Sequence, residues 1–127
     1  MPKILIVDDD PLIRLLLEEI LAEFQAAGIQ LLSADNGLSA IDLIKREEPD
    51  IVFLDVMLPK MDGFEVCSIV RNDLGLKNVY IVVLTAKGQE LDKQKARECG
   101  ADYYITKPFT IHDVIKKVRE VLRPASP

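Results

Sequence analysis

Three consecutive aspartates follow a short apolar run near the start of the chain. The run is Ile4–Val7, and Asp8, Asp9 and Asp10 come directly after it, while Asp55 follows a second apolar run in the same way. Brought together in a partly desolvated cleft, such carboxylates would repel one another strongly. A hard divalent cation relieves this repulsion, and Mg²⁺ prefers oxygen ligands from one or two carboxylates, waters and a phosphate. These residue types therefore predict a site for magnesium and a phosphoryl group together.

Thr85 and Lys107 add a hydroxyl and an ammonium group at the ends of two further apolar runs. Both groups donate hydrogen bonds, so both suit phosphoryl oxygens, and the ammonium also suits a carboxylate. Charged residues at the end of a strand are usually just solvated, and Asp8 to Asp10 alone would favour that interpretation. Polar groups at the ends of four separate runs argue against it.

Apolar runs alternate with amphipathic segments along the whole sequence. Short runs rich in Ile, Val and Leu are typical of parallel strands that are buried on both faces. Segments in which apolar residues recur at helical spacing are typical of helices packed on a core. Five strands are predicted, at Ile4–Val7, Ile29–Ala34, Ile51–Leu54, Tyr80–Leu84 and Asp102–Thr106. Five helices are predicted, from Pro11 to Gly28, from Gly37 to Pro49, over Phe64–Arg71, over Glu90–Cys99 and from Thr110 to about Leu122.

Local signals indicate where two of these helices begin. Asp10 is a capping residue, and Pro11 takes the first helical position, where a missing N–H does no harm. Thr110 and Asp113 form a capping-box-like pair at the start of the last helix. In the first helix, the residues predicted to face the core are Leu12, Ile13, Leu16, Leu17, Ile20, Leu21 and Phe24.

Five strand–helix units in succession predict an α/β fold, in which a mostly parallel sheet carries helices on both faces. Ligands of open parallel sheets bind beyond the carboxyl ends of the strands. Asp8, Asp9, Asp55, Thr85 and Lys107 all lie at that edge. The predicted topology therefore brings the carboxylates, the hydroxyl and the ammonium group to one place.

The totals of the sequence limit the classes of function. The chain has 127 residues, of which 49 % are hydrophobic and 29 % charged, and this suits one ordinary domain with a real core. No apolar run approaches the roughly 18 residues of a membrane span and no signal peptide is recognisable, so a cytoplasmic location is expected. The net charge of -5 argues against direct nucleic-acid binding, which needs a basic face. Cys67 and Cys99 form no CxxC pair and are expected to be buried free thiols.

Four stretches of the sequence resemble the receiver domains of two-component response regulators. They are ILIVDDDP, IVFLDVMLPKMDG, VVLTA and YYITKPF, in this order, and the resemblance covers essentially the whole chain. It implies a flavodoxin-like sheet of five parallel strands, in the order 2-1-3-4-5, with helices on both faces. It also implies one receiver domain over residues 1–123, followed by a C-terminal tail or linker start at 124–127.

The resemblance implies a role for each acidic residue of the predicted site. Asp55 is similar to the phosphoacceptor, which attacks the phosphorus of a phosphohistidine on a sensor histidine kinase or a histidine phosphotransfer protein. Asp9, Asp55 and the backbone carbonyl of Met57 would hold Mg²⁺, and Asp8 would help through a bound water. A receiver of this kind is a regulatory phosphoacceptor and not an enzyme: it catalyses only its own phosphoryl transfer and acyl-phosphate hydrolysis.

The same resemblance implies that Thr85 and Lys107 contact the phosphoryl group and that Tyr104 is a conformational switch. Lys107 would pair with phosphoryl oxygens, or with Asp55 in the unphosphorylated protein, and Lys107-Pro108 matches a cis peptide bond of the family. Thr85 would move toward the phosphoryl group, and the Tyr104 ring would turn into the space that it leaves. That change would reshape the face formed by the fourth predicted helix, the fifth strand and the fifth helix, and so control an output domain or a downstream protein.

Two positions that vary in the family bear on the lifetime of the phosphoryl group, and here they are Met57 and Lys87. Because a Met57 side chain cannot hydrogen-bond an attacking water, we expect an acyl phosphate that lasts longer than one flanked by an amide and a carboxylate. Met57 and Met61 are otherwise expected to be packing residues of their loop.

Two other functions compete with a phosphorylation-controlled switch. Phosphatases of the haloacid dehalogenase type also place a nucleophilic aspartate after an apolar strand, but they need a second acid two residues later, where this chain has Met57. They also usually carry a cap insertion, for which this chain has no room. A receiver-like module that binds partners without phosphorylation is the other alternative, and the complete acidic set argues against it.

The resemblance leaves the output of the domain open. The chain is either a complete single-domain regulator or a receiver from a larger protein with a DNA-binding or enzymatic output. The stretch from LTAKGQELDK to GADYYITKPF resembles receivers of winged-helix transcription factors, which dimerise through the switched face; Lys93 and Asp113 would form one intersubunit pair in such a homodimer. Tyr103 replaces the acid expected there, and Pro124 lies near where a basic residue is wanted.

Overall fold

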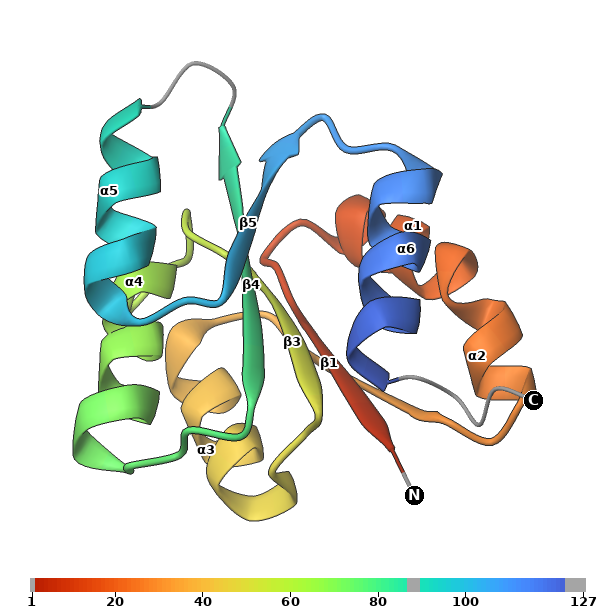
Figure 1. Cartoon of the computed structure of the whole chain (residues 1–127), viewed down its shortest axis with the longest axis horizontal. Coiled ribbons are helices and arrows are strands. Elements are labelled where there is room, and N and C mark those ends of the chain that lie inside the picture. Colours follow the sequence, from red (N-terminus) through yellow and green to blue (C-terminus); the bar gives the residue numbers. More distant parts are fainter. Residues whose placement is uncertain (1, 87–89, 123–127) are drawn as a thin grey trace.

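The computed structural model describes the backbone of residues 2–86 and 90–122, and the side chains of these residues except 90–92. Five parallel strands form one sheet in the order β2-β1-β3-β4-β5 (Figure 1), which confirms the predicted fold class and strand order. The strands are β1 Lys3–Val7, β2 Gln30–Ala34, β3 Ile51–Asp55, β4 Tyr80–Ala86 and β5 Tyr103–Lys107. The helices are α1 Pro11–Ile20, α2 Ala22–Ala26, α3 Gly37–Glu47, α4 Gly63–Ser68, the π-helical turn η1 Ile69–Asp73, α5 Glu90–Cys99 and α6 Ile111–Leu122.

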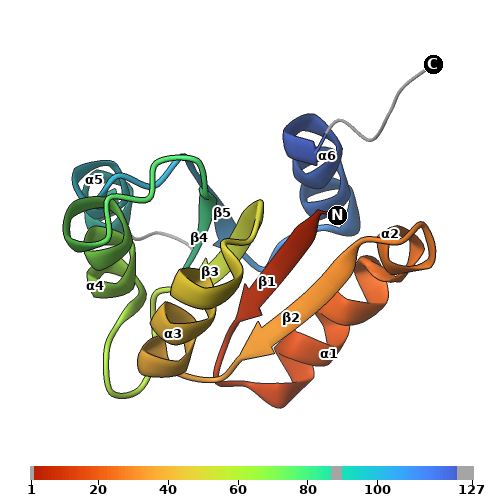
Figure 2. The same cartoon turned by 90° about the horizontal axis from the view of Figure 1, so that it is seen from below.

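Helices cover both faces of the sheet. α3, α4 and α5 lie on one face, and α1, α2 and α6 lie on the other (Figures 1 and 2). The apolar residues of β1 alternate between the two layers, because successive side chains of a strand point to opposite faces. Leu5 and Val7 pack in the cluster beneath α3 and α4, whereas Ile4 and Ile6 pack in the cluster beneath α1 and α6. Burial on both faces accounts for the continuous apolar run that precedes the aspartates.

The capping residues predicted from the sequence are confirmed. Asp10 accepts a hydrogen bond from the backbone N–H of Leu12 at 2.9 Å, and Pro11 begins α1. The Thr110 hydroxyl accepts from the N–H of Asp113 at 3.0 Å, and the Asp113 carboxylate accepts in return from the N–H of Thr110 at 3.3 Å. These bonds satisfy N–H groups that the first turn of a helix leaves unpaired, so they fix where α1 and α6 start beside the carboxyl ends of β1 and β5.

The first helix differs from the prediction in two ways. It bends at Leu21 into α1 and α2, and the bend lets Leu21 and Phe24 pack in the same apolar cluster. Its apolar stripe is also wider than the surface that the sheet can cover. Leu12 is 73 % exposed and Leu16 is 43 % exposed, so the prediction that both belong to the core is wrong.

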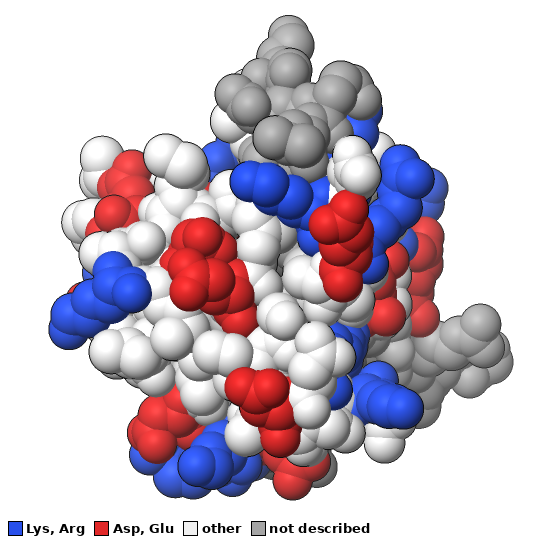
Figure 3. Space-filling view, turned by 90° about the vertical axis from the view of Figure 1, so that its left-hand side faces the viewer, with Lys and Arg blue, Asp and Glu red and all other residues white. Residues whose placement is uncertain are grey.

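The remaining elements agree with the predicted order. The predicted helix over Phe64–Arg71 begins at Gly63 after its cap, Asp62, and continues through η1. Cys67 and Cys99 are buried free thiols, as expected. Among the described residues, no helix is long and apolar enough to cross a membrane. On the side where α4 and α5 lie, acidic and basic side chains are interspersed (Figure 3).

Candidate functional site

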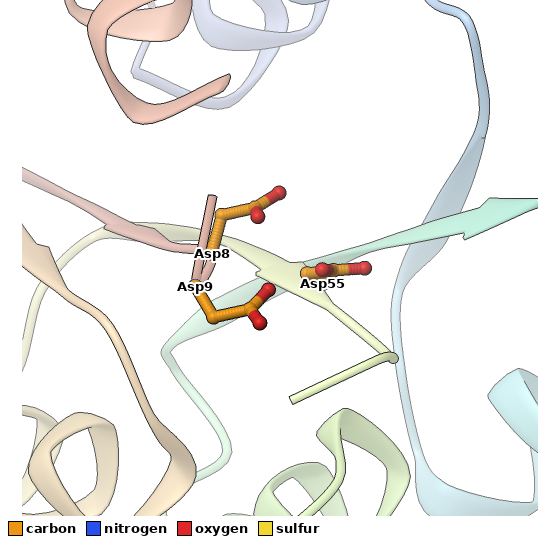
Figure 4. A group of neighbouring side chains, drawn as sticks. All are labelled: Asp8, Asp9 and Asp55. Carbon is orange, nitrogen blue, oxygen red and sulfur yellow. The ribbon is translucent and has the colours of Figure 1, made fainter. Parts of the chain in front are cut away.

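Three carboxylates meet at the carboxyl ends of two neighbouring strands. Asp8 and Asp9 follow β1, Asp55 is the last residue of β3, and their side chains are directed to the same side (Figure 4). One carboxylate oxygen from each residue lies within 4.8 Å of those of the other two. Asp8 and Asp55 are buried, whereas Asp9 is exposed. The site is therefore an acidic cluster with two buried carboxylates and one exposed carboxylate.

Lys107, the last residue of β5, contacts this cluster. Its Nζ atom lies 2.9 Å from Asp8 Oδ2 and 3.3 Å from Asp55 Oδ1. The contact with Asp55 is the one expected of an unphosphorylated receiver, but the shorter contact with Asp8 was not predicted from the sequence. Thr85, on β4, is also buried, and it lies opposite Thr106 of β5 in the parallel ladder. The structure thus brings the predicted hydroxyl and ammonium groups to the same end of the sheet as the carboxylates.

Backbone hydrogen bonds orient the two buried carboxylates. Asp8 Oδ1 accepts from the N–H of Asp10 at 2.9 Å, and the carbonyl oxygen of Asp8 accepts from the Arg14 guanidinium at 2.8 Å. Asp55 Oδ1 accepts from the N–H of Met57 at 3.2 Å, besides its contact with Lys107. Asp55 Oδ2 accepts no hydrogen bond from the described residues, and none of their buried side-chain polar atoms lacks a partner. Solvent therefore reaches Oδ2.

The surroundings shift the pKa values of Asp55 and Lys107. Burial and the neighbouring Asp8 charge raise the pKa of Asp55 above its usual range, and the Lys107 ammonium opposes them in part. Burial lowers the pKa of Lys107, but the hydrogen bond that its ammonium donates to Asp8 and the charge of Asp55 outweigh it, so the pKa of Lys107 is raised overall. Lys107 consequently stays protonated at neutral pH and stands as a fixed positive charge in the site.

The donor set fits a hard divalent cation. Three carboxylates face one ammonium group, so the cluster keeps an excess of negative charge that Lys107 does not neutralise. All the side-chain donors are oxygens, which are the ligands of Mg²⁺ rather than of zinc or copper. This composition agrees with the Mg²⁺ site that the resemblance to receiver domains implies.

Two glycines position the loop between β3 and α4. The sequence pattern placed them at a turn and in a loop, but it did not predict their close contact with this loop. A Cβ atom on Gly63 would lie 2.3 Å from the carbonyl oxygen of Asp55, and a Cβ atom on Gly37 would lie 2.3 Å from that of Met61. Both distances are far below van der Waals contact, so only glycine lets the first turns of α3 and α4 approach this loop. The Asp-Gly pair that starts α4, eight residues after Asp55, was the available signal.

The other predicted residues have mixed outcomes. The Lys107-Pro108 bond is cis, as predicted. Met61 packs against the core, but Met57 is 75 % exposed, so its prediction as a packing residue is wrong. Lys87 lies outside the described residues. Tyr104, on β5, is half-buried, and its ring lies 5.6 Å from Lys93 Nζ.

Comparison with known proteins gives the same family throughout. The family model described as response regulator receiver domain matches residues 4–119. The chain is 41 % identical over 123 residues to the DNA-binding dual master transcriptional regulator RpaA of Synechocystis sp.; the match covers 97 % of this chain and 50 % of the relative. The chain therefore spans about half the length of that curated relative.

Solved structures of the same fold include proteins from distant organisms. The chemotaxis protein CheY4 of Vibrio cholerae superposes with a TM-score of 0.82 at 31 % identity, over 95 % of this chain and 98 % of that one. The receiver domain of Ssk1 from Saccharomyces cerevisiae was crystallised with the histidine phosphotransfer signaling protein Ypd1. The matched chain of that complex gives a TM-score of 0.85 at 29 % identity, over 94 % of this chain and 88 % of its own length.

Proposed function

Because this chain belongs to the response regulator receiver domains, we propose that it is a phosphorylation-controlled switch whose phosphoacceptor is Asp55. One observation carries the choice of Asp55. It is the only one of the three clustered aspartates whose carboxylate is buried, contacts Lys107 through one oxygen and leaves the other oxygen open to solvent. Asp8 has both oxygens engaged, and Asp9 is exposed at the rim.

The reaction is a nucleophilic substitution at phosphorus. Asp55 Oδ2 attacks the phosphorus of a phosphohistidine, so that a P–O bond forms and the P–N bond breaks. The electron pair of that bond stays on the imidazole nitrogen, which takes up a proton. Lys107 pairs with the phosphoryl oxygens and the Thr85 hydroxyl donates to them, so both groups stabilise the charge that develops in the transition state.

Asp9, Asp55 and the Met57 backbone carbonyl would hold Mg²⁺, with Asp8 acting through a bound water. When bound, the cation supplies neutralisation of the charge shared by the carboxylates and the phosphoryl group. The domain acts on no other substrate in this proposal. Its chemistry is confined to its own phosphorylation and to hydrolysis of its own acyl phosphate.

An apolar surface beside the site suits the phosphodonor. Three large apolar side chains of α1 are exposed: Leu12, Leu15 and Leu16. Exposed apolar side chains that gather on one helix are a feature of interaction sites. A cavity of about 360 Å³ lies between this helix and Lys107 of the site. It is lined by Ile13, Leu16, Ala86, Lys107, Pro108 and Phe109. A sensor histidine kinase or a histidine phosphotransfer protein docked here would present its histidine to Asp55, a partnership of the kind named for Ssk1 and Ypd1.

The output surface we propose is the α5–β5–α6 face. Thr85 and Tyr104 lie on the same face of neighbouring strands, because Tyr104 pairs with Val83 and Thr106 pairs with Thr85. Movement of Thr85 toward a phosphoryl group would open space for the Tyr104 ring. The altered face would control an output domain or a downstream protein, or form a homodimer. A DNA-binding output is one example, since the relative RpaA is named a DNA-binding transcriptional regulator.

Direct nucleic-acid binding by this domain is not part of the proposal, since charges of both signs are interspersed over α4 and α5 (Figure 3). We place the receiver domain at residues 1–123 and a tail or linker start at 124–127. Its location would be the cytoplasm, where the buried thiols Cys67 and Cys99 remain reduced.

Incubation with acetyl phosphate, followed by intact mass measurement, tests the proposal. We expect one added phosphoryl group that requires Mg²⁺ and is absent from Asp55→Asn. Asp10→Asn is the matched control, because it removes a neighbouring carboxylate while asparagine still caps α1. No adduct on the wild type would contradict the proposal and favour a module that binds partners without phosphorylation.

A further inference from the structure

Two adjacent tyrosines of β5 stack on one another. The ring centroids of Tyr103 and Tyr104 lie 6.2 Å apart, and the ring planes make an angle of 23°. Consecutive residues of a strand start from opposite faces of the sheet. Their rings can meet only around a free edge, and β5 is the edge strand next to β4. The Tyr104 ring therefore lies out over the edge of the sheet in this structure.

Lysine side chains from two helices flank this pair of rings. Lys117 Nζ, from α6, lies 3.7 Å from the centroid of the Tyr103 ring, and Lys93 Nζ, from α5, lies 5.6 Å from that of Tyr104. Glu120 holds Lys117 at 2.9 Å. Cation–π contacts of this kind add to the stacking of the rings. The contacts form a continuous bridge from α6 through both tyrosines to α5.

An inward turn of Tyr104 is incompatible with this bridge. Tyr104 lies opposite Val83, and Thr85 follows two residues later on the same face of β4. A ring that turns toward Thr85 moves across the face beneath α5, away from the edge where it contacts Tyr103. The stack is therefore a property of the outward position alone.

We propose that Tyr103 is a positioning residue that holds the Tyr104 ring outward and so sets the resting state of the switch. The inference rests on the proposed function, because it needs Tyr104 to turn inward on phosphorylation. The resemblance of this stretch to receivers of winged-helix transcription factors implies an acid where this chain has Tyr103. A carboxylate at this position cannot stack on an aromatic ring.

Removal of the stack has a predictable size. An aromatic pair shifts a two-state equilibrium about 2- to 10-fold beyond its burial. Binding at Asp55 and the position of Tyr104 are linked, so a change in one equilibrium appears to the same factor in the other. Loss of the Tyr103 ring should therefore tighten the binding of a phosphoryl mimic at Asp55 by that factor, although Tyr103 does not contact the site.

The test uses beryllofluoride with Mg²⁺ as the phosphoryl mimic and protein labelled with 3-fluorotyrosine. The chain has three tyrosines, so the ¹⁹F spectrum is simple, and Tyr104→Phe assigns the signal of Tyr104. In Tyr103→Ala we expect binding that is about 2- to 10-fold tighter than in the wild type. The Tyr104 signal of the free variant should also move toward its bound position. Tyr103→Phe keeps the ring and should match the wild type.

Two failures are distinguishable. If the wild type binds beryllofluoride but Tyr103→Ala matches Tyr103→Phe in affinity and in the Tyr104 signal, the positioning role is wrong and the proposed function stands. If the wild type does not bind beryllofluoride, the proposed function is contradicted, and the role of Tyr103 is overturned with it.

Discussion

Lys107 Nζ lies 2.9 Å from Asp8 Oδ2, which makes Asp8 the nearest partner of the lysine in the site. The ion pair joins residues that are 99 positions apart and spans the end of the sheet from β1 to β5. It neutralises the most buried carboxylate and leaves Asp55 with a longer contact of 3.3 Å. Lys107 and a bound divalent cation would consequently stabilise the same carboxylates, so we expect each to substitute partly for the other.

Lys107→Ala should make the stability of the protein depend on Mg²⁺. Removal of the ammonium leaves Asp8 and Asp55 buried without a positive partner, which we expect to cost about 1–3 kcal/mol of unfolding free energy in chelator. Mg²⁺ should restore more of this free energy in the variant than it adds to the wild type. Without the ammonium the carboxylates should bind the cation more tightly, and a ligand of the folded state stabilises it more when it binds more tightly. Urea denaturation with Mg²⁺ or with chelator measures both quantities.

Lys3→Ala is the matched control for that experiment. Lys3 also makes a 2.9 Å ion pair, with Glu47, and its side chain is 27 % exposed, as is that of Lys107. It lies at the opposite end of the sheet, so its loss should leave the effect of Mg²⁺ unchanged. An equal Mg²⁺ effect in Lys107→Ala and the wild type would refute the shared role of lysine and cation.

Asp55→Asn should stabilise the protein at neutral pH in chelator. Burial and the Asp8 charge raise the pKa of Asp55 in the folded protein above its value in the unfolded chain. The folded state therefore binds the proton more tightly, and the free energy of unfolding falls as the pH rises between the two pKa values. Asparagine does not titrate, so it removes this loss of stability. The unfolding free energy of Asp55→Asn relative to the wild type should therefore increase as the pH rises and then level off.

Denaturation midpoints measured from about pH 4, near the usual pKa of aspartate, to pH 8 test this prediction. Asp42→Asn is the control, since Asp42 is an exposed carboxylate paired with Arg46 on α3. If the stability difference between Asp55→Asn and the wild type does not change over this pH range, the pKa of the Asp55 carboxylate is not raised in the folded protein.

Gly63→Ala should weaken both folding and phosphorylation. Its Cβ would meet the Asp55 carbonyl oxygen at 2.3 Å, so the backbone of β3 or α4 must move. We expect a loss of about 1–3 kcal/mol of unfolding free energy and slower phosphorylation by acetyl phosphate. Gly28→Ala separates this clash from backbone strain, because Gly28 has a φ of +100° but open space around it. That control should cost about 1 kcal/mol and leave the phosphorylation rate unchanged.

Met57→Asn should shorten the life of the acyl phosphate. The Met57 side chain is exposed beside Asp55 and has no group that can orient an attacking water. An amide supplies such a group, and one hydrogen bond worth about 1.4 kcal/mol would speed hydrolysis about tenfold. The decay of the phosphorylated mass after removal of acetyl phosphate measures the rate. Met57→Leu should decay like the wild type, and an unchanged lifetime in Met57→Asn would count against the idea.

The fold was largely predictable because its signals are local. Buried parallel strands require continuous apolar runs, and the caps at Asp10 and Thr110 need only residues within the first turn of their helices. Ligands of parallel sheets bind beyond the carboxyl ends of the strands, so the predicted topology alone placed four residues together, without any knowledge of distances. They are Asp8, Asp55, Thr85 and Lys107.

What the sequence did not predict depends on contacts between distant segments. The pairing of Lys107 with Asp8 depends on how the ends of β1 and β5 are positioned relative to each other. The need for glycine at position 63 depends on how closely α4 approaches Asp55. The exposure of Leu12 and Leu16 has a different cause. An apolar stripe shows which residues avoid water in some context, but it does not tell the core of the domain from a surface that a partner covers.

The most direct test of the account is to locate the phosphoryl group. Protein phosphorylated by acetyl phosphate with Mg²⁺ would be reduced with borohydride, which converts an aspartyl phosphate to homoserine, and its peptides would be sequenced by mass spectrometry. A phosphoacceptor role of Asp55 predicts homoserine at position 55 and at neither Asp8 nor Asp9, which lie within the same cluster. Homoserine at position 8 or 9, or at no position, would contradict it.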